Sequence, residues 1–148
     1  GLMNHLFLIL IISILSCVSS MSHAQEISNG TYIVHKLGLV PKYMMLEVND
    51  DTINFEIFAR WQGSWVPWID GWNETYKPQL LTHNADGSLT NENISISAQK
   101  PGKSKWKGIA KNSISGNVKF KLKKTAAIPK NCKRVKDEAM QFLQNKSD

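Results

Sequence analysis

Residues 43–58 read YMMLEVNDDTINFEIF, and this stretch decides the fold class. From Thr52 to Ile57, polar and apolar residues alternate, which is the period-two pattern of a half-buried strand. Residues 43–48 are apolar enough to form a partner strand, and Asn49-Asp50-Asp51 between the two is typical turn chemistry. The sequence therefore predicts a β-hairpin over 43–58.

Further strands are predicted on both sides of this hairpin. Apolar and polar residues alternate at 93–98 and at 118–123, 31–37 is β-branched and aromatic, and 103–111 alternates less cleanly. Turn-forming residues rich in Gly, Pro, Asn and Asp separate these segments. Short strands at this spacing, with no long helical pattern between them, predict a mainly β domain built as one small antiparallel β-barrel or β-sandwich.

The C-terminal tail has a different period. Val135, Ala139, Phe142 and Leu143 form one apolar stripe at helical spacing, which predicts an α-helix at about 133–144 packed against the barrel or across its end. The strand number and the terminal helix resemble a lipocalin-like meander at most, because the sequence contains no family motif that would support a closer resemblance.

The first 24 residues predict export. Leu6–Leu15 is an apolar run of ten residues, whereas a membrane span needs about 20. Ser22-His23-Ala24 fits a small-x-small cleavage site. We therefore expect a signal peptide at 1–24 and a single exported, β-rich domain at 25–148, in the periplasm or outside the cell. Gly1 and Leu2 precede Met3 and are interpreted as a cloning remnant.

Two alternatives at the N-terminus stay open. The apolar run could be retained as a membrane anchor, or Cys17 could be a lipoprotein site, and membrane attachment is expected only through this segment or a lipidated Cys17. Cleavage after Ala24 would leave Cys132 as the only cysteine, so we expect no internal disulfide bond. A free thiol and an intermolecular bridge through Cys132 both remain possible.

Aromatic residues gather in one short segment, where Pro67 and two glycines argue against a helix and favour a strand end followed by a structured loop. A tryptophan ring has a large apolar face and one N–H donor, which suits a sugar, a partner protein or a membrane interface. The alternative is that these rings fill the core, in part or completely. The candidate binding residues are Trp61, Trp65, Trp68, Trp72 and Tyr76.

Charge is divided unevenly along a chain whose formal net charge is +6. Residues 25–99 hold four basic and nine acidic residues, whereas 100–136 hold thirteen basic residues and no acidic one. If 103–111 and 118–124 pair as a hairpin, lysines of both strands would share one outward face. The candidate lysines are Lys105, Lys107, Lys119, Lys121 and Lys123.

Three explanations for these lysines remain open. They could bind an external polyanion through salt-sensitive contacts, or be balanced by the acidic half of the same domain. They could also protect an exposed sheet edge from aggregation. Nucleic acid is the least favoured polyanion, because the protein is expected to be exported and has no nucleic-acid-binding motif.

The sequence offers little for catalysis. It contains no nucleophile-elbow, zincin, P-loop or dinucleotide-binding motif, and one cysteine with the separated His35 and His83 does not define a zinc site. We expect no enzyme, cofactor or metal.

The leading hypothesis is an exported binding protein for a glycan, a lipid or an anionic polymer. The alternative is a role with an extracytoplasmic protein partner, as an inhibitor, an immunity protein or an envelope-complex subunit, and a small hydrolase ranks third.

Overall fold

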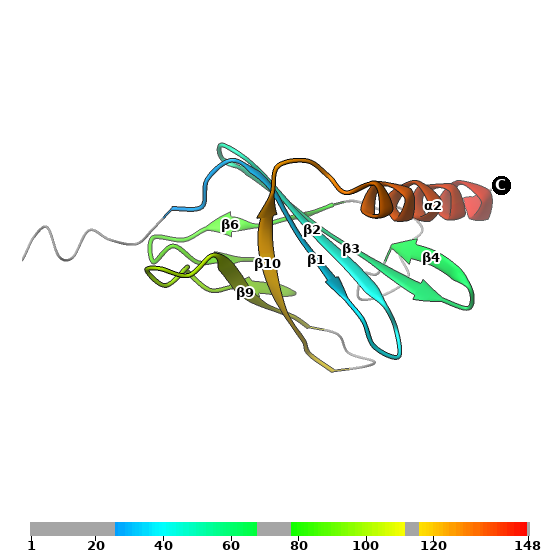
Figure 1. The fold of residues 1–148 in the computed structure, drawn as a ribbon, viewed down its shortest axis with the longest axis horizontal. Coiled ribbons are helices and arrows are strands. Elements are labelled where there is room, and N and C mark those ends of the chain that lie inside the picture. The colour runs from blue at the N-terminus through cyan, green and yellow to red at the C-terminus, as the bar shows by residue number, and fades with distance from the viewer. Residues whose placement is uncertain (1–25, 68–77, 112–115, 148) are drawn as a thin grey trace, which may run out of the picture.

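A computed structural model describes residues 26–67, 78–111 and 116–147 of the chain (Figure 1). The segment predicted as a signal peptide and the candidate residues Trp68, Trp72 and Tyr76 lie outside this part. The N-terminal half contains β1 (Gly30–Lys36), β2 (Lys42–Asn49), β3 (Thr52–Trp61), β4 (Ser64–Pro67), β5 (Gln79–Leu80) and β6 (Thr82–His83). The C-terminal half contains β7 (Leu89–Thr90), β8 (Ile94–Ile96), β9 (Lys105–Ala110), β10 (Val118–Thr125) and the helix α2 (Lys130–Ser147).

These strands form one antiparallel sheet that curls into a half-barrel (Figure 1). Their order is β4-β3-β2-β1-β10-β9-β8-β7-β6, and β5 pairs with β3. The amide of Leu81, between β5 and β6, donates to the carbonyl oxygen of Ile53 at 2.9 Å, so this short connection runs back to β3. The predicted mainly β, antiparallel fold with a C-terminal helix is confirmed.

The inner face of the curled sheet holds the larger hydrophobic core. Alternate residues of β2, β3, β9 and β10 enter it, which explains the period-two pattern at 52–57 and 118–123. The rings of Phe55 and Phe120, from opposite parts of the sheet, lie 5.4 Å apart between centroids. The core residues with the lowest exposure are Met44, Leu46, Leu89, Ile96, Leu122 and Phe55.

A second hydrophobic core lies between the outer face of the sheet and α2. The sheet contributes Tyr43, Met45, Phe58 and Trp65, and the helix packs its apolar stripe on them. This stripe is Cys132, Val135 and Ala139, with Met140 at its margin. The prediction of a terminal helix is therefore confirmed, and the helix extends beyond the expected 133–144 at both ends, beginning directly after Pro129.

One charged group is buried in this second core. Glu56 is 4% exposed and its Oε1 accepts a hydrogen bond from Nζ of Lys136 on α2 at 2.9 Å. A buried carboxylate needs such a partner, because an unpaired buried charge is strongly destabilising. The ion pair therefore links β3 to one defined position along the helix.

The segment after Trp61 differs from the sequence prediction of a structured loop. Gln62 and Gly63 have φ angles of 50° and 79°, and they form a two-residue turn that leads directly into β4. Positive φ at both positions matches the twist of a hairpin. Pro67 is tolerated because β4 is the first strand in the sheet order and therefore an edge strand.

The contact between β9 and β10 can be tested at a glycine. Gly108 lies opposite Phe120, and a methyl group at Gly108 would overlap the Phe120 ring. We expect Gly108→Ala to lower the free energy of unfolding by about 1–3 kcal/mol, measured by urea titration. Gly38→Ala is the control, since no atom lies within 4 Å of its added carbon. Equal unfolding midpoints for the two variants would contradict the packing.

Candidate functional site

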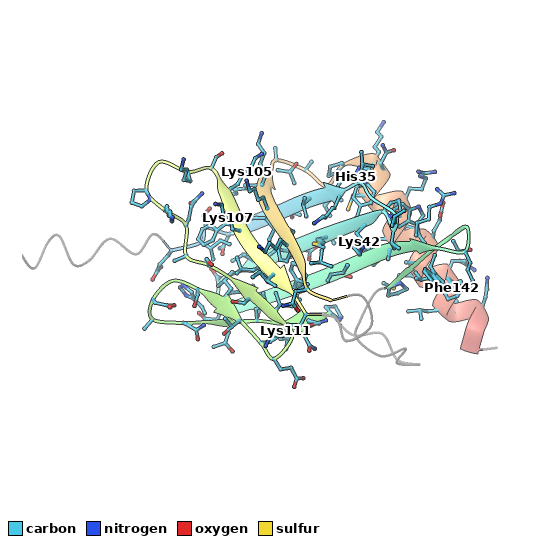
Figure 2. All side chains as sticks on the ribbon, turned by 90° about the horizontal axis from the view of Figure 1, so that it is seen from below. His35, Lys42, Lys105, Lys107, Lys111 and Phe142 are labelled. Carbon is cyan, nitrogen blue, oxygen red and sulfur yellow. The ribbon has the colours of Figure 1, made fainter. Side chains whose placement is uncertain are left out.

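The five candidate lysines lie together on the outward face of the β9–β10 hairpin, and we call them the lysine ladder. Each alternates with a residue that points into the core, and all five are exposed. Lys107 is directly opposite Lys121, and Lys105 is directly opposite Lys123. Figure 2 labels Lys105 and Lys107 along β9. The hairpin that the sequence analysis assumed is therefore present.

Among the described residues, no acidic side chain pairs with the ladder. None of the five lysines forms a salt bridge with a residue in the described ranges. Like charges directly opposite each other in a sheet are destabilising, so the hairpin retains an unfavourable electrostatic term. Another cation lies at one end of the ladder, where Nζ of Lys36 donates to the carbonyl oxygen of Lys119 at 2.6 Å.

Cationic and aromatic groups continue from the ladder across β1 and β2 to the helix. Ile33 on β1 is paired with Lys123, and two residues further along β1 the exposed His35 ring stacks on Tyr43 at 4.1 Å. Burial raises the pKa of Tyr43, while the positive charge of Arg134 on α2 acts in the opposite direction. The first turn of α2 contains no acidic residue.

Trp61 and Trp65 do not form a common surface. Trp61 is 48% exposed, whereas Trp65 is 7% exposed and its ring lies 5.6 Å from Tyr43 beneath α2. Trp61 pairs with Ser64 and Trp65 pairs with Arg60, so the two indoles lie on opposite faces of the β3–β4 hairpin. One of these two rings is therefore exposed and the other lies in a core, which is the mixed arrangement that the sequence analysis left open, and the two-residue turn between them separates the rings.

Sequence analysis missed a group of exposed apolar residues at one end of the sheet, which we call the apolar tip: Leu37, Leu39 and Trp61. The two leucines lie in the β1–β2 loop and are 76% and 106% exposed. The amide of Arg60 donates to the carbonyl oxygen of Pro41 at 3.0 Å, which holds this loop beside the β3–β4 hairpin. The sequence signal was an apolar turn, Leu37-Gly38-Leu39, close to Lys36 and Lys42.

The described residues do not bring together the groups that catalysis or metal binding would need. No set of three or more His, Cys, Asp and Glu side chains within them could hold a metal ion. His35 and His83 are both exposed, His35 on β1 and His83 on the edge strand β6. No helix among these residues is long and apolar enough to cross a membrane.

Cys132 is a free thiol that is completely buried beneath the sheet. Burial, and then the negative charge of Glu56, raise the pKa of this thiol above its ordinary value, and Lys136 acts in the opposite direction. An intermolecular disulfide through Cys132 would require the helix–sheet interface to open.

Comparisons with protein-family models, with curated proteins and with solved structures gave no match. A function for this chain therefore has to be argued from its own side chains. Within the described residues, the lysine ladder and the apolar tip are surface features that packing of the fold does not explain.

The two placed tryptophans should behave differently on substitution. Trp65→Ala should lower the free energy of unfolding by about 3 kcal/mol or more, because it opens a cavity under α2. Trp61→Ala should change it by less than about 0.5 kcal/mol, since the ring makes part of the exposed surface. Urea titration measures both values. A greater loss for Trp61→Ala would contradict the opposite placement of the two indoles.

The thiol of Cys132 should be protected in the folded protein. In a Cys17→Ser background, a thiol reagent at pH 8 should modify Cys132 on the order of a hundredfold more slowly than in the urea-unfolded chain. The pKa of Cys132 is higher in the folded protein than in the unfolded chain, so the unfolded thiol loses its proton at a lower pH. Burial of the neutral thiol therefore contributes fully to the free energy of unfolding below pH 9.0, and this contribution is lost as the pH rises further. Equal labelling rates would contradict the burial of Cys132.

Proposed function

We propose that this protein is a non-enzymatic, extracytoplasmic binding protein that holds an extended anionic polymer on the lysine ladder. The supporting observation is the arrangement of five exposed lysines on two paired strands, with two pairs directly opposite and no acidic partner in the described residues. An anionic ligand would remove the repulsion between these pairs. Binding would therefore relieve an unfavourable term as well as add favourable contacts.

Protection of a sheet edge, one of the alternatives from the sequence, does not explain the ladder. β9 lies between β8 and β10, and β10 lies between β9 and β1, so neither strand is at an edge. The strands at the edges of the described sheet are β4 and β5, which both pair with β3, and β6. The edge explanation is therefore wrong. It required β9 or β10 to lie at an edge of the sheet, and the order of strands in a sheet cannot be read from local sequence pattern.

The geometry favours a polymer over a single small anion. The ladder lies on the outer side of a curled sheet, and lysines two positions apart on one strand are about 6.5–7 Å apart. Two short rows of ammonium groups at this spacing suit a chain with repeated charges. An ammonium group is a hydrated point charge without the fixed geometry of a guanidinium group, so we expect salt-sensitive binding with modest selectivity.

An acidic polysaccharide or another anionic polymer of the cell surface fits both this chemistry and the expected export. A glycan held by stacked aromatic rings receives less support, because Trp61 and Trp65 face opposite sides of their hairpin. Nucleic acid remains the least favoured polyanion for the reasons given by the sequence.

The test removes two opposed charges from the ladder. Lys107→Gln/Lys121→Gln should weaken binding to dextran sulfate at least about tenfold and make its dependence on NaCl concentration shallower, because fewer counterions are released. Calorimetry at several salt concentrations measures both. Unfolding in urea should show unchanged or slightly increased stability, since the variant removes a like-charge pair.

A control variant with the same change in net charge tests whether dextran sulfate binds to the ladder or responds to the positive charge of the whole protein. Lys100 lies in the turn before β9 and Lys130 begins α2, and both are exposed and outside the ladder. Lys100→Gln/Lys130→Gln should retain most of the affinity. Equal losses in the two double variants would show that dextran sulfate responds only to net charge.

A further inference from the structure

The apolar tip combines three exposed side chains from two adjacent connections. Leu39 is 106% exposed and Leu37 is 76% exposed, so they project from the β1–β2 loop with little contact to the rest of the protein. Trp61 follows Arg60, whose amide is bonded to Pro41 of the same loop. Isolated apolar side chains are common on protein surfaces, but two projecting leucines in a loop that is bonded to β3 next to the exposed Trp61 expose a local apolar group.

Cations surround the tip. Lys36 and Lys42 are paired on β1 and β2 immediately before and after the loop, and the exposed Arg60 precedes Trp61. Burial, and then the neighbouring charge of Lys36, lower the pKa of Lys42. The sequence from Lys36 to Lys42 contains no acidic residue. The ammonium group of Lys42 donates to the carbonyl oxygen of Val40 at 3.0 Å, so the exposed cations that flank the apolar side chains are Lys36 and Arg60.

This arrangement has the parts that interfacial binding to a bilayer requires. Leucine side chains can enter the boundary between headgroups and acyl chains, and tryptophan is enriched at that depth. Lysine and arginine set slightly behind them would contact anionic headgroups, where each contributes favourably. A bilayer adapts to a projecting loop and needs no matching pocket.

We propose that the apolar tip inserts into the surface of an anionic lipid bilayer, with the exposed Lys36 and Arg60 on the headgroups. A second copy of the chain suits the tip less well, because two tips in contact would bring these cations together. The proposal goes beyond polymer binding by the lysine ladder, since the tip lies on the β1–β2 loop and the end of β3. It is also independent of the N-terminal segment. The sequence analysis expected membrane attachment only through that segment.

The first experiment measures partitioning of the full chain onto phosphatidylcholine vesicles with and without 30% phosphatidylglycerol, by co-sedimentation. Leu37→Ser/Leu39→Ser should partition at least about fivefold less than the wild type onto the anionic vesicles. Leu80→Ser/Ile128→Ser is the matched control, because these residues are also exposed apolar side chains but lie elsewhere. It should partition as the wild type does. The N-terminal segment is the same in every variant.

A second measurement follows insertion directly. Acyl chains brominated near the headgroup should quench tryptophan emission in the wild type, and Trp61→Phe should remove at least about half of this quenching. Unchanged partitioning of the leucine variant, or unchanged quenching in Trp61→Phe, would overturn the proposal. So would equal partitioning onto neutral and anionic vesicles, because the cations would then have no role.

Two further variants separate this proposal from polymer binding. Lys36→Gln/Arg60→Gln should lower partitioning onto anionic vesicles, and the leucine variant should bind dextran sulfate as the wild type does. If Lys107→Gln/Lys121→Gln alone abolished vesicle binding, the tip proposal would be overturned and the lipid would instead be a polyanion held by the ladder. All variants change exposed or half-buried side chains, and urea titration verifies that each is folded.

Discussion

The packing of α2 on the outer face of β2, β3 and β4 is the constraint on which the other features depend. It buries those strands on both faces, so that Met44 enters the barrel while Met45 lies beneath the helix. The pair between Glu56 and Lys136 links the helix to β3 within this interface. Because α2 lies beside β4 and away from β9, the outer face of the β9–β10 hairpin is left to solvent (Figure 1). A polar outer face on that hairpin follows from where the helix packs.

The elements that were predicted correctly are those whose burial pattern is local. The alternation at 52–57 and 118–123 indicates that one face of each strand is in the core. The apolar stripe that begins at Val135 indicates a helix with one buried side. The continuous apolar run at 43–46 reports burial on both faces, which a strand shows when a second layer covers it. Local pattern thus located the main strands, the helix and the lysine ladder.

The errors arose where the outcome depends on distant contacts. Trp65 is buried because α2, formed from residues 130–147, packs on β4. The spacing of the tryptophans in the sequence gives no information about this contact. The turn that separates Trp61 from Trp65 needs positive φ at Gln62, which is uncommon for a residue other than glycine. The position of β9 and β10 inside the sheet is equally non-local. The exposed leucines were missed because apolar residues are ordinarily assigned to the core.

The ladder and the tip would act over different distances. Attraction between exposed charges extends over about 8–10 Å at physiological ionic strength, whereas apolar side chains gain free energy only when they leave water. The two features adjoin where Lys36 reaches the carbonyl oxygen of Lys119. A polyanionic surface could therefore attract the ladder first and bring the tip close to any bilayer beneath it. The ladder lies within β9 and β10, whereas the tip lies on the β1–β2 loop and the end of β3, so either can be altered while the other keeps its geometry.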